Sequence, residues 1–146
     1  MITSFIRAFV LGTSAVLLIA CNRPRLTRGT SEEATLGKAL YDQYCASCHG
    51  PEGEGQPDWK VPGPNGVYPA PPHTADGHTW HHADQLLLEI IANGGSRPNS
   101  GMPGFRDQLT ENEMAAILAY IKTFWGEREL EFQQDVTEHY IESDND

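Results

Sequence analysis

Two cysteines and a histidine form the pattern in this chain that is best suited to chemistry. Cys45 and Cys48 are followed directly by His49, in the sequence Cys-Ala-Ser-Cys-His. In a helix the positions i, i+3 and i+4 lie on one side, so the two thiols and the imidazole can reach one bound group. The C-x-x-C-H pattern is typical of a c-type haem attachment site. It predicts one covalent haem, with thioethers from both cysteines and iron coordination by His49.

Three other uses of these residues fit less well. Zinc would suit the spacing of His73, His78 and His82, but these histidines are distant in sequence from Cys48. A thioredoxin-like dithiol needs a strand before Cys45, where the sequence instead shows a helical pattern. A disulfide between the two cysteines would form only if haem were never attached. The pattern therefore favours haem.

The haem iron needs a second axial ligand, and Met102 is the best placed candidate. It stands in the sequence Gly-Met-Pro-Gly-Phe, in a loop between two predicted helices, where a flexible thioether can approach the haem face opposite His49. Met114 lies instead on the apolar stripe of the last predicted helix, where a methionine is more often part of the core. The other candidates are His73, His78, His81, His82 and His139.

The elements that must position these residues are helical, because residues 31 to 126 show no strand pattern. The first predicted helix opens with the capping-box sequence Thr-Ser-Glu-Glu at residues 30–33 and runs into Cys45. A middle helix is indicated by apolar residues between Ala83 and Ile91. The last helix opens with a second capping box at residues 110–113 and carries an apolar stripe with spacings of three and four residues.

Residues 50 to 79 form a long loop that calls for a bound group. This stretch of 30 residues contains six Gly and seven Pro, which excludes regular structure over most of its length. Loops longer than about 15 residues are unusual in compact domains unless something orders them. Three short helices also bury little apolar surface among themselves. A bulky apolar cofactor such as haem would supply both the missing core and the order.

On these residues, the chain resembles class I monohaem cytochrome c, in a lipoprotein-type bacterial member. The resemblance rests on the helix leading into Cys-Ala-Ser-Cys-His-Gly, the Gly-Met-Pro-Gly-Phe loop and the closing helix Ile-Leu-Ala-Tyr-Ile, and it spans residues 31–126. It implies a small all-α cytochrome c-type fold, with three main helices and a long Gly/Pro-rich loop wrapped around one covalently bound haem.

The resemblance also assigns structural roles. In the family the first and last helices cross closely, and Gly37 with Tyr41 would pack against Tyr120 and Ile121. A proline carbonyl accepts a hydrogen bond from the axial histidine and fixes its orientation. The candidates here are Pro69, Pro71 and Pro72, in a segment that departs from the commoner form with Leu after the Pro.

A histidine-rich segment precedes the middle helix and resembles one found in some membrane-associated bacterial members. Trp80 is expected to pack near the haem edge or to donate its indole N–H to a haem propionate. His78, His81 and His82 are interpreted as surface residues at a helix start, in preference to a pH-sensitive cluster or a second metal site.

The first thirty residues predict export and lipidation. Residues 1–20 read as a signal peptide, with Arg7 before an apolar run. Leu-Ile-Ala-Cys at residues 18–21 resembles a lipobox, which implies that Cys21 becomes the lipid-bearing mature N-terminus. Residues 22–30 would form a basic tether. These features predict an extracytoplasmic protein, anchored by lipid to the periplasmic side of a bacterial membrane or to the cell surface.

Charge limits the partners. The chain has 10 Lys and Arg against 20 Asp and Glu, a formal net charge of −10, which is the wrong sign for binding nucleic acid. Residues 127–146 hold eight acidic residues and one arginine, so we expect an acidic C-terminal tail that is disordered by default, with a short helix folded back on the domain as the alternative. We expect redox partners with a basic docking face.

Coordination by histidine and methionine predicts the function, because it leaves no open iron position for a substrate. We therefore expect a carrier of single electrons, with no catalytic residue and no small-molecule substrate. Two alternatives stay open. The chain could be the electron-transfer subunit of a membrane oxidase or dehydrogenase complex, or a sensor or peroxidase in which Met102 dissociates from the iron.

Overall fold

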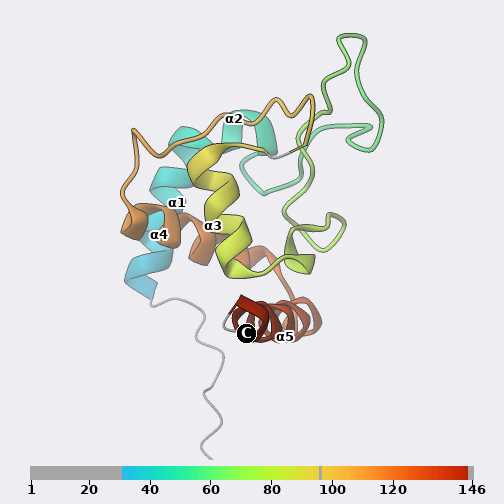
Figure 1. Ribbon diagram of the computed structural model, residues 1–146. Coiled ribbons are helices and arrows are strands. Elements are labelled where there is room, and N and C mark those ends of the chain that lie inside the picture. The colour runs from blue at the N-terminus through green and yellow to red at the C-terminus, as the bar shows by residue number, and fades with distance from the viewer. Residues whose placement is uncertain (1–30, 96, 145–146) are drawn as a thin grey trace, which may run out of the picture.

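The computed structural model describes residues 31–95 and 97–144, and this part of the chain is all-α (Figure 1). Its helices are α1 (Ser31–Tyr44), α2 (Ala46–His49), α3 (Asp84–Asn93), α4 (Glu111–Ile121) and α5 (Glu127–Asp144), with single 3-10 turns η1 (Thr79–His81) and η2 (Lys122–Phe124). No strand occurs among the described residues, which confirms the predicted fold class. The predicted signal peptide, Cys21 and the predicted basic tether lie outside the described residues.

The closest packing of two helices is that of α1 on α4, and it depends on Gly37. A Cβ atom on Gly37 would overlap the carbonyl oxygen of Ala116 and lie 2.6 Å from its carbonyl carbon. One turn further along α1, Tyr41 is fully buried, and its ring meets that of Tyr120 edge-on at 5.3 Å. The helix crossing expected from the sequence is therefore present.

Helix α4 supplies much of the core and begins where the sequence predicts. The Thr110 hydroxyl accepts a hydrogen bond from the Glu113 backbone N–H, and the Glu113 carboxylate accepts one from the Thr110 N–H at 2.8 Å. This reciprocal pair satisfies N–H groups that the first turn of a helix leaves without partners. The apolar stripe that follows is buried, at Met114, Ile117, Leu118 and Ile121.

The Gly/Pro-rich segment of residues 50–78 has no helix and extends beyond the helices at one side of the molecule (Figure 1). Turns and isolated hydrogen bonds order it. Gln56 N–H donates to the carbonyl of Ala70 at 2.9 Å, and the Ala70 N–H donates to the Gln56 side chain at 3.1 Å. A single parallel bridge joins Tyr68 to Ser100. The loop thus reaches the segment that carries Met102.

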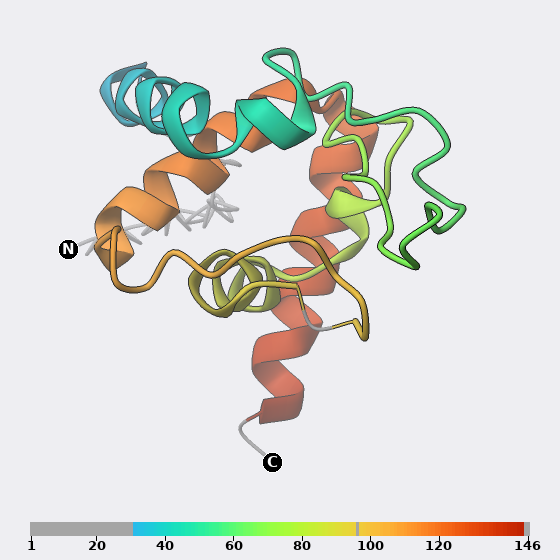
Figure 2. The ribbon, with the colours of Figure 1, turned by 90° about the horizontal axis from the view of Figure 1, so that it is seen from above.

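The acidic C-terminal segment forms a long helix rather than the disordered tail expected by default. Helix α5 crosses below α3 and η1, and Leu130 and Gln133 are buried between them (Figures 1 and 2). The Gln133 amide donates to the carbonyl of His82 at 3.2 Å and to the Asp84 carboxylate. The alternative of a helix folded back on the domain is therefore the correct one.

Within residues 31–95 and 97–144, no helix has both the length and the apolar character to cross a membrane.

Candidate functional site

The thiols and imidazole of the C-x-x-C-H pattern are positioned by one turn of helix. Tyr41 O accepts from Cys45 N–H at 2.8 Å, so the chain continues directly from α1. The carbonyl of Cys45 then accepts from the N–H groups of Cys48 at 3.1 Å and His49 at 2.9 Å. The Tyr41 hydroxyl donates to the carbonyl of Gly50 at 3.0 Å, which ties the end of α2 back to α1. The three side chains therefore share one short, well-fixed turn.

The two cysteines differ in environment and are not joined to each other. Cys45 is buried and Cys48 is exposed, and both thiols are free. Burial, with a smaller contribution from the neighbouring Cys48, raises the pKa of the Cys45 thiol to about 11. Reduced thiols on one turn, one facing the core and one at the surface, are compatible with two thioether bonds to a group that lies partly inside the fold.

The protonation of His49 is set by Pro71. The Nδ1 atom of His49 lies 2.9 Å from the carbonyl oxygen of Pro71, and a carbonyl can only accept, so Nδ1 carries the proton and donates. The lone pair is then on Nε2, the atom available to a metal. Burial lowers the pKa of His49 and so keeps the ring neutral. Among Pro69, Pro71 and Pro72, the second is therefore the orienting residue.

A second histidine, His73, lies against the first. The rings of His49 and His73 are stacked, with centroids 4.1 Å apart and planes 18° from parallel. His73 Nδ1 is 3.0 Å from the Thr79 hydroxyl, which itself lies 3.4 Å from the carbonyl of Pro72. Since the hydroxyl donates to that carbonyl, it accepts from His73. The pKa of His73 lies well below its usual value. Burial is the main cause, and the neighbouring His49 and His78 contribute less.

The backbone around His73 is fixed from two further directions. The buried indole N–H of Trp125 donates to the His73 carbonyl at 2.7 Å, and the His73 N–H donates to the carbonyl of Gly53 at 2.7 Å. Trp125 lies in the link between η2 and α5, 52 residues away in sequence. His73 was considered from the sequence only as a possible metal ligand, and neither its stacking on His49 nor its contact with Trp125 could be expected, because these residues do not share a local motif.

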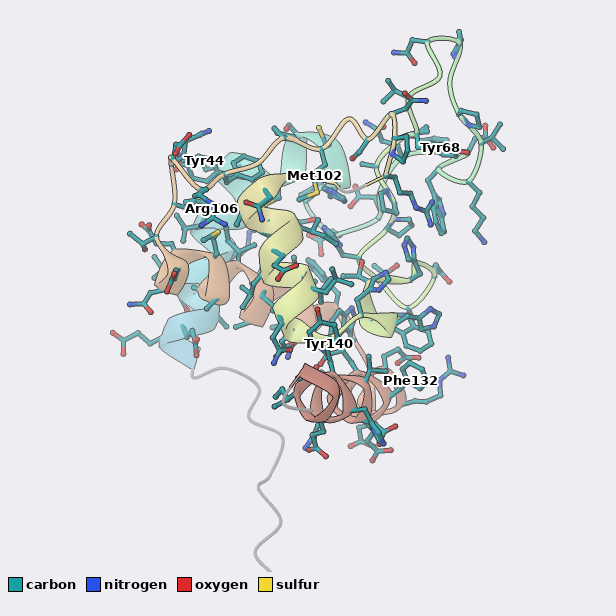
Figure 3. The ribbon with its side chains drawn as sticks, viewed as in Figure 1. Tyr44, Tyr68, Met102, Arg106, Phe132 and Tyr140 are labelled. Atoms are coloured by element: carbon teal, nitrogen blue, oxygen red, sulfur yellow. The ribbon has the colours of Figure 1, made fainter. Side chains whose placement is uncertain are left out.

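Met102 lies on the segment after α3, at the same end of the molecule as α2 (Figure 3). Its carbonyl accepts from the Gly95 N–H at 3.2 Å, and its own N–H donates to the Ser100 hydroxyl at 3.2 Å. Gly94, with φ +90°, permits this close return, because a Cβ there would lie 2.8 Å from the Met102 carbonyl oxygen. Met102 is half-buried and packs against the same apolar core that contains Cys45.

The other candidate ligands have different surroundings. Met114 is buried in the core on α4. His73 stacks on His49 and its Nδ1 already has the Thr79 hydroxyl as a partner, so it lies beside His49 and not opposite it. His139 lies on α5, with Nδ1 2.8 Å from the Asp135 carbonyl. Among the described residues no group of three or more His, Cys, Asp or Glu is arranged to hold a metal ion, so the zinc interpretation gains no support.

Trp80 packs against α5. Its ring lies 5.3 Å from that of Phe132, which Figure 3 labels on α5. The Arg128 guanidinium is 5.8 Å from the centroid of the Trp80 ring, and the indole N–H is 3.4 Å from the carbonyl of Ala75. The indole N–H therefore already has an acceptor within the chain, and a contact of Trp80 with haem stays a prediction. His81 is exposed beside it, with ring centroids 3.8 Å apart.

The residues present fit a covalently bound haem. An all-α fold in which two free thiols and a neutral imidazole share one helical turn, with Pro71 holding the imidazole, is the arrangement of a c-type haem protein. The sequence model of the family described as "Cytochrome c" matches residues 34–125, more than half of the chain, and the chain belongs to this family. No curated protein and no solved structure matches it.

Family membership establishes the general function. Cytochrome c domains carry haem c covalently and transfer electrons, and they are typically carriers rather than enzymes, with other redox proteins as partners. The match ends at residue 125, so α5 lies outside the family region although it packs on the domain.

Proposed function

We propose that the chain is a monohaem electron carrier in which Cys45 and Cys48 hold the haem by thioethers and His49 and Met102 bind the iron. Such a group, when bound, supplies a reversible one-electron couple. The chain's own residues attach it, orient one axial ligand through Pro71 and bring a thioether from the facing segment. With His49 and Met102 both binding the iron, no coordination position would remain for a substrate.

The observation that carries this proposal is the hydrogen bond from His49 Nδ1 to the Pro71 carbonyl, at 2.9 Å. It selects the tautomer with a lone pair on Nε2 and fixes the ring direction before any metal arrives. A structural histidine in a core has no need for this arrangement beside two reduced cysteines. The tautomer, the free thiols and the family match all support one covalent haem.

The test of the ligand assignment is the optical spectrum of the ferric protein beside two methionine variants. Met102→Ala should lose the weak iron–thioether charge-transfer band and gain the ability to bind carbon monoxide when reduced. Met114→Leu is the matched control, and it should keep the band because Met114 lies in the core. Persistence of the band in Met102→Ala would rule out Met102. Binding of carbon monoxide by the wild type would instead favour a sensor or peroxidase.

We infer that the carrier is lipid-anchored outside the cytoplasm, through Cys21. The support is the sequence alone: an apolar signal-like run followed by Leu-Ile-Ala-Cys at residues 18–21. Metabolic labelling with a radioactive fatty acid should mark the wild type and not Cys21→Ser. Labelling of Cys21→Ser would disprove the assignment, and recovery of unlabelled wild type from the soluble fraction would disprove the anchor.

We propose that the redox partner of this carrier docks through a basic surface. Residues 31–126 contain 12 acidic and 5 basic residues, and α5 adds further carboxylates. Opposite charge raises association rates and is screened by salt. The bimolecular rate of electron transfer to a basic redox protein should therefore fall as ionic strength rises. A rate that does not change with salt would contradict a basic docking face on the partner. A partner that stays bound to the chain in membrane extracts would show that the chain is a subunit of a complex.

A further inference from the structure

The ring of His73 lies against one face of the ring of His49, the proposed iron ligand. The two imidazoles are nearly parallel, with planes 18° apart and centroids separated by 4.1 Å. The His49 ring is also held at its edge, because its Nδ1 donates a hydrogen bond to the Pro71 carbonyl at 2.9 Å. One contact at the edge and one at a face together define the plane of the His49 ring.

His73 is itself fixed through both its side chain and its backbone. Its Nδ1 donates to the Thr79 hydroxyl at 3.0 Å, and its backbone N–H donates to the Gly53 carbonyl at 2.7 Å. Its own carbonyl accepts from the indole N–H of Trp125 at 2.7 Å. These three partners come from well-separated segments of the chain. The His73 ring is therefore a fixed part of the surroundings of His49 and not a freely rotating group.

The His73 ring is neutral. The residue is only 9% exposed, and none of the ion pairs in residues 31–95 and 97–144 includes it. A buried charge without a partner of opposite charge is costly, so the ring takes its uncharged form. Its Nδ1 carries the proton that it donates to Thr79. The surface that His73 presents to His49 is thus the face of a neutral aromatic ring, which carries partial negative charge.

This contact differs in strength between the two redox states of a haem protein. His49, as the proposed axial ligand, shares the positive charge that remains on the iron when one electron passes to a redox partner. The face of an aromatic ring attracts positive charge, and it does so more strongly where water is excluded. An aliphatic side chain of similar volume has no such face. The stacked ring therefore stabilises the oxidised protein more than the reduced protein.

Packing alone gives no reason for a histidine at this place. A buried polar side chain needs hydrogen-bond partners, and replacing both partners by apolar groups of the same shape is often neutral or stabilising. Here the Thr79 hydroxyl, which itself lies 3.4 Å from the Pro72 carbonyl, is used to satisfy the His73 ring. The polar pair is best explained by what the ring does for His49.

We propose that His73 is a positioning residue for the haem iron, which fixes the plane of the His49 ring and lowers the reduction potential through its neutral aromatic face. This inference rests on the proposed function, because it takes His49 as an iron ligand. It goes beyond that function by naming a residue that neither attaches the haem nor binds the iron.

The first measurement is the midpoint reduction potential of the haem-loaded protein. His73→Leu removes the aromatic face and should raise the potential. The equilibrium constant for reduction should increase by about threefold to tenfold, and tenfold corresponds to about 59 mV for one electron. His73→Phe keeps an aromatic face without the hydrogen bond to Thr79, so its potential should stay closer to that of wild type. His73→Gln can still donate to Thr79 but has no ring, and its potential should rise as in His73→Leu.

The second measurement reports the direction of the His49 ring. In the ferric protein the proton NMR shifts of the four haem methyl groups depend on the plane of the axial imidazole. Their pattern should change in His73→Leu and stay near that of wild type in His73→Phe. Gln133→Ala is the control for lost stability, because Gln133 bonds the His82 carbonyl and the Asp84 carboxylate at the start of α3. It should leave both the potential and the methyl pattern unchanged.

Several results would overturn the inference. One is a potential that is unchanged or lower in both His73→Leu and His73→Gln while haem is still bound. Another is a methyl pattern that is the same in wild type and His73→Leu. A shift of potential in Gln133→Ala as large as that in His73→Leu would show that lost stability, and not the ring, is the cause. The haem spectrum is recorded in the same samples, and a wild type without it would count against the proposed function instead.

Discussion

The imidazole of His73 lies flat against the imidazole of His49, with ring centroids 4.1 Å apart. His49 is thereby held at two points, through its Nδ1 by the Pro71 carbonyl and across its face by His73. His73 is itself fixed by Thr79 and, through its carbonyl, by Trp125. The proposed ligand His49 is therefore connected to Trp125, just before α5, by ring stacking on His73 and by the hydrogen bond from Trp125 to the His73 carbonyl.

Replacing Thr79 tests this connection. Thr79→Val keeps the shape but removes the acceptor for His73 Nδ1, which leaves a buried N–H without a partner. The free energy of unfolding should fall by about 1 to 3 kcal/mol, the usual cost of such a group. Chemical denaturation of the haem-loaded protein measures it. Thr79→Ser keeps the hydroxyl and should lose distinctly less, and equal losses in the two variants would show that the hydrogen bond does not matter.

Replacing Gly37 tests the crossing of α1 and α4. Glycine to alanine inside a helix ordinarily gains about 1 kcal/mol, but here the new Cβ would overlap the Ala116 carbonyl. The helices would have to separate, and overpacking of this kind costs about 1 to 3 kcal/mol. Gly37→Ala should therefore destabilise the protein in thermal unfolding. Gly63→Ala is the control, because the nearest atoms to its Cβ lie 3.4 Å away. A stabilised Gly37→Ala would contradict the close approach.

Local patterns were enough to predict the helices and the attachment motif. The Thr110–Glu113 capping box and the apolar stripe after it depend on spacings of three and four residues, which sequence shows directly. The turn that brings Cys45, Cys48 and His49 together is equally local. Such features could be predicted because each is set by neighbours within one or two helical turns.

Long-range contacts could not be predicted in the same way. Three prolines were equivalent in sequence, and only the fold shows that Pro71 faces His49. The contact of Trp125 with His73 joins residues 52 positions apart. Helix α5 was also underestimated, because its acidic composition indicates disorder while its stability depends on burying Leu130 and Gln133.

Stability should depend on pH through His78 and His82. Burial, followed by nearby cationic groups, lowers the pKa of each below its ordinary value near 6.5. The folded state then binds fewer protons than the unfolded state. The contribution of these histidines to the free energy of unfolding is therefore fully present above about pH 6.5, and it is lost as the pH decreases from this value toward their pKa values in the folded protein. The guanidinium midpoint at pH 7.5 and pH 5.5 measures the fall. His78→Gln with His82→Gln should reduce the fall, and an unchanged fall would exclude these residues as its source.

Helix α5 is expected to be an integral part of the domain, because it completes the start of α3. The residue before α3 is Ala83, which cannot cap the helix, and the Asp84 N–H donates instead to the Thr137 hydroxyl at 3.2 Å. Gln133, which is 2% exposed, adds hydrogen bonds to Asp84 and to the carbonyl of His82. A chain that ends at residue 126 loses these contacts together with the burial of Leu130.

A point substitution separates this effect from a general loss of helix. Gln133→Ala leaves a cavity and removes a buried donor from the His82 carbonyl, so the free energy of unfolding should fall by about 1 to 3 kcal/mol. Gln134→Ala is the matched control, because Gln134 is only half-buried and bonds Glu138 on the same helix. Alanine favours a helix at both positions, so intrinsic propensity does not distinguish them. Equal denaturation midpoints in the two variants would mean that α5 contributes nothing to the domain through Gln133, and that the boundary at residue 126 marks an independent unit.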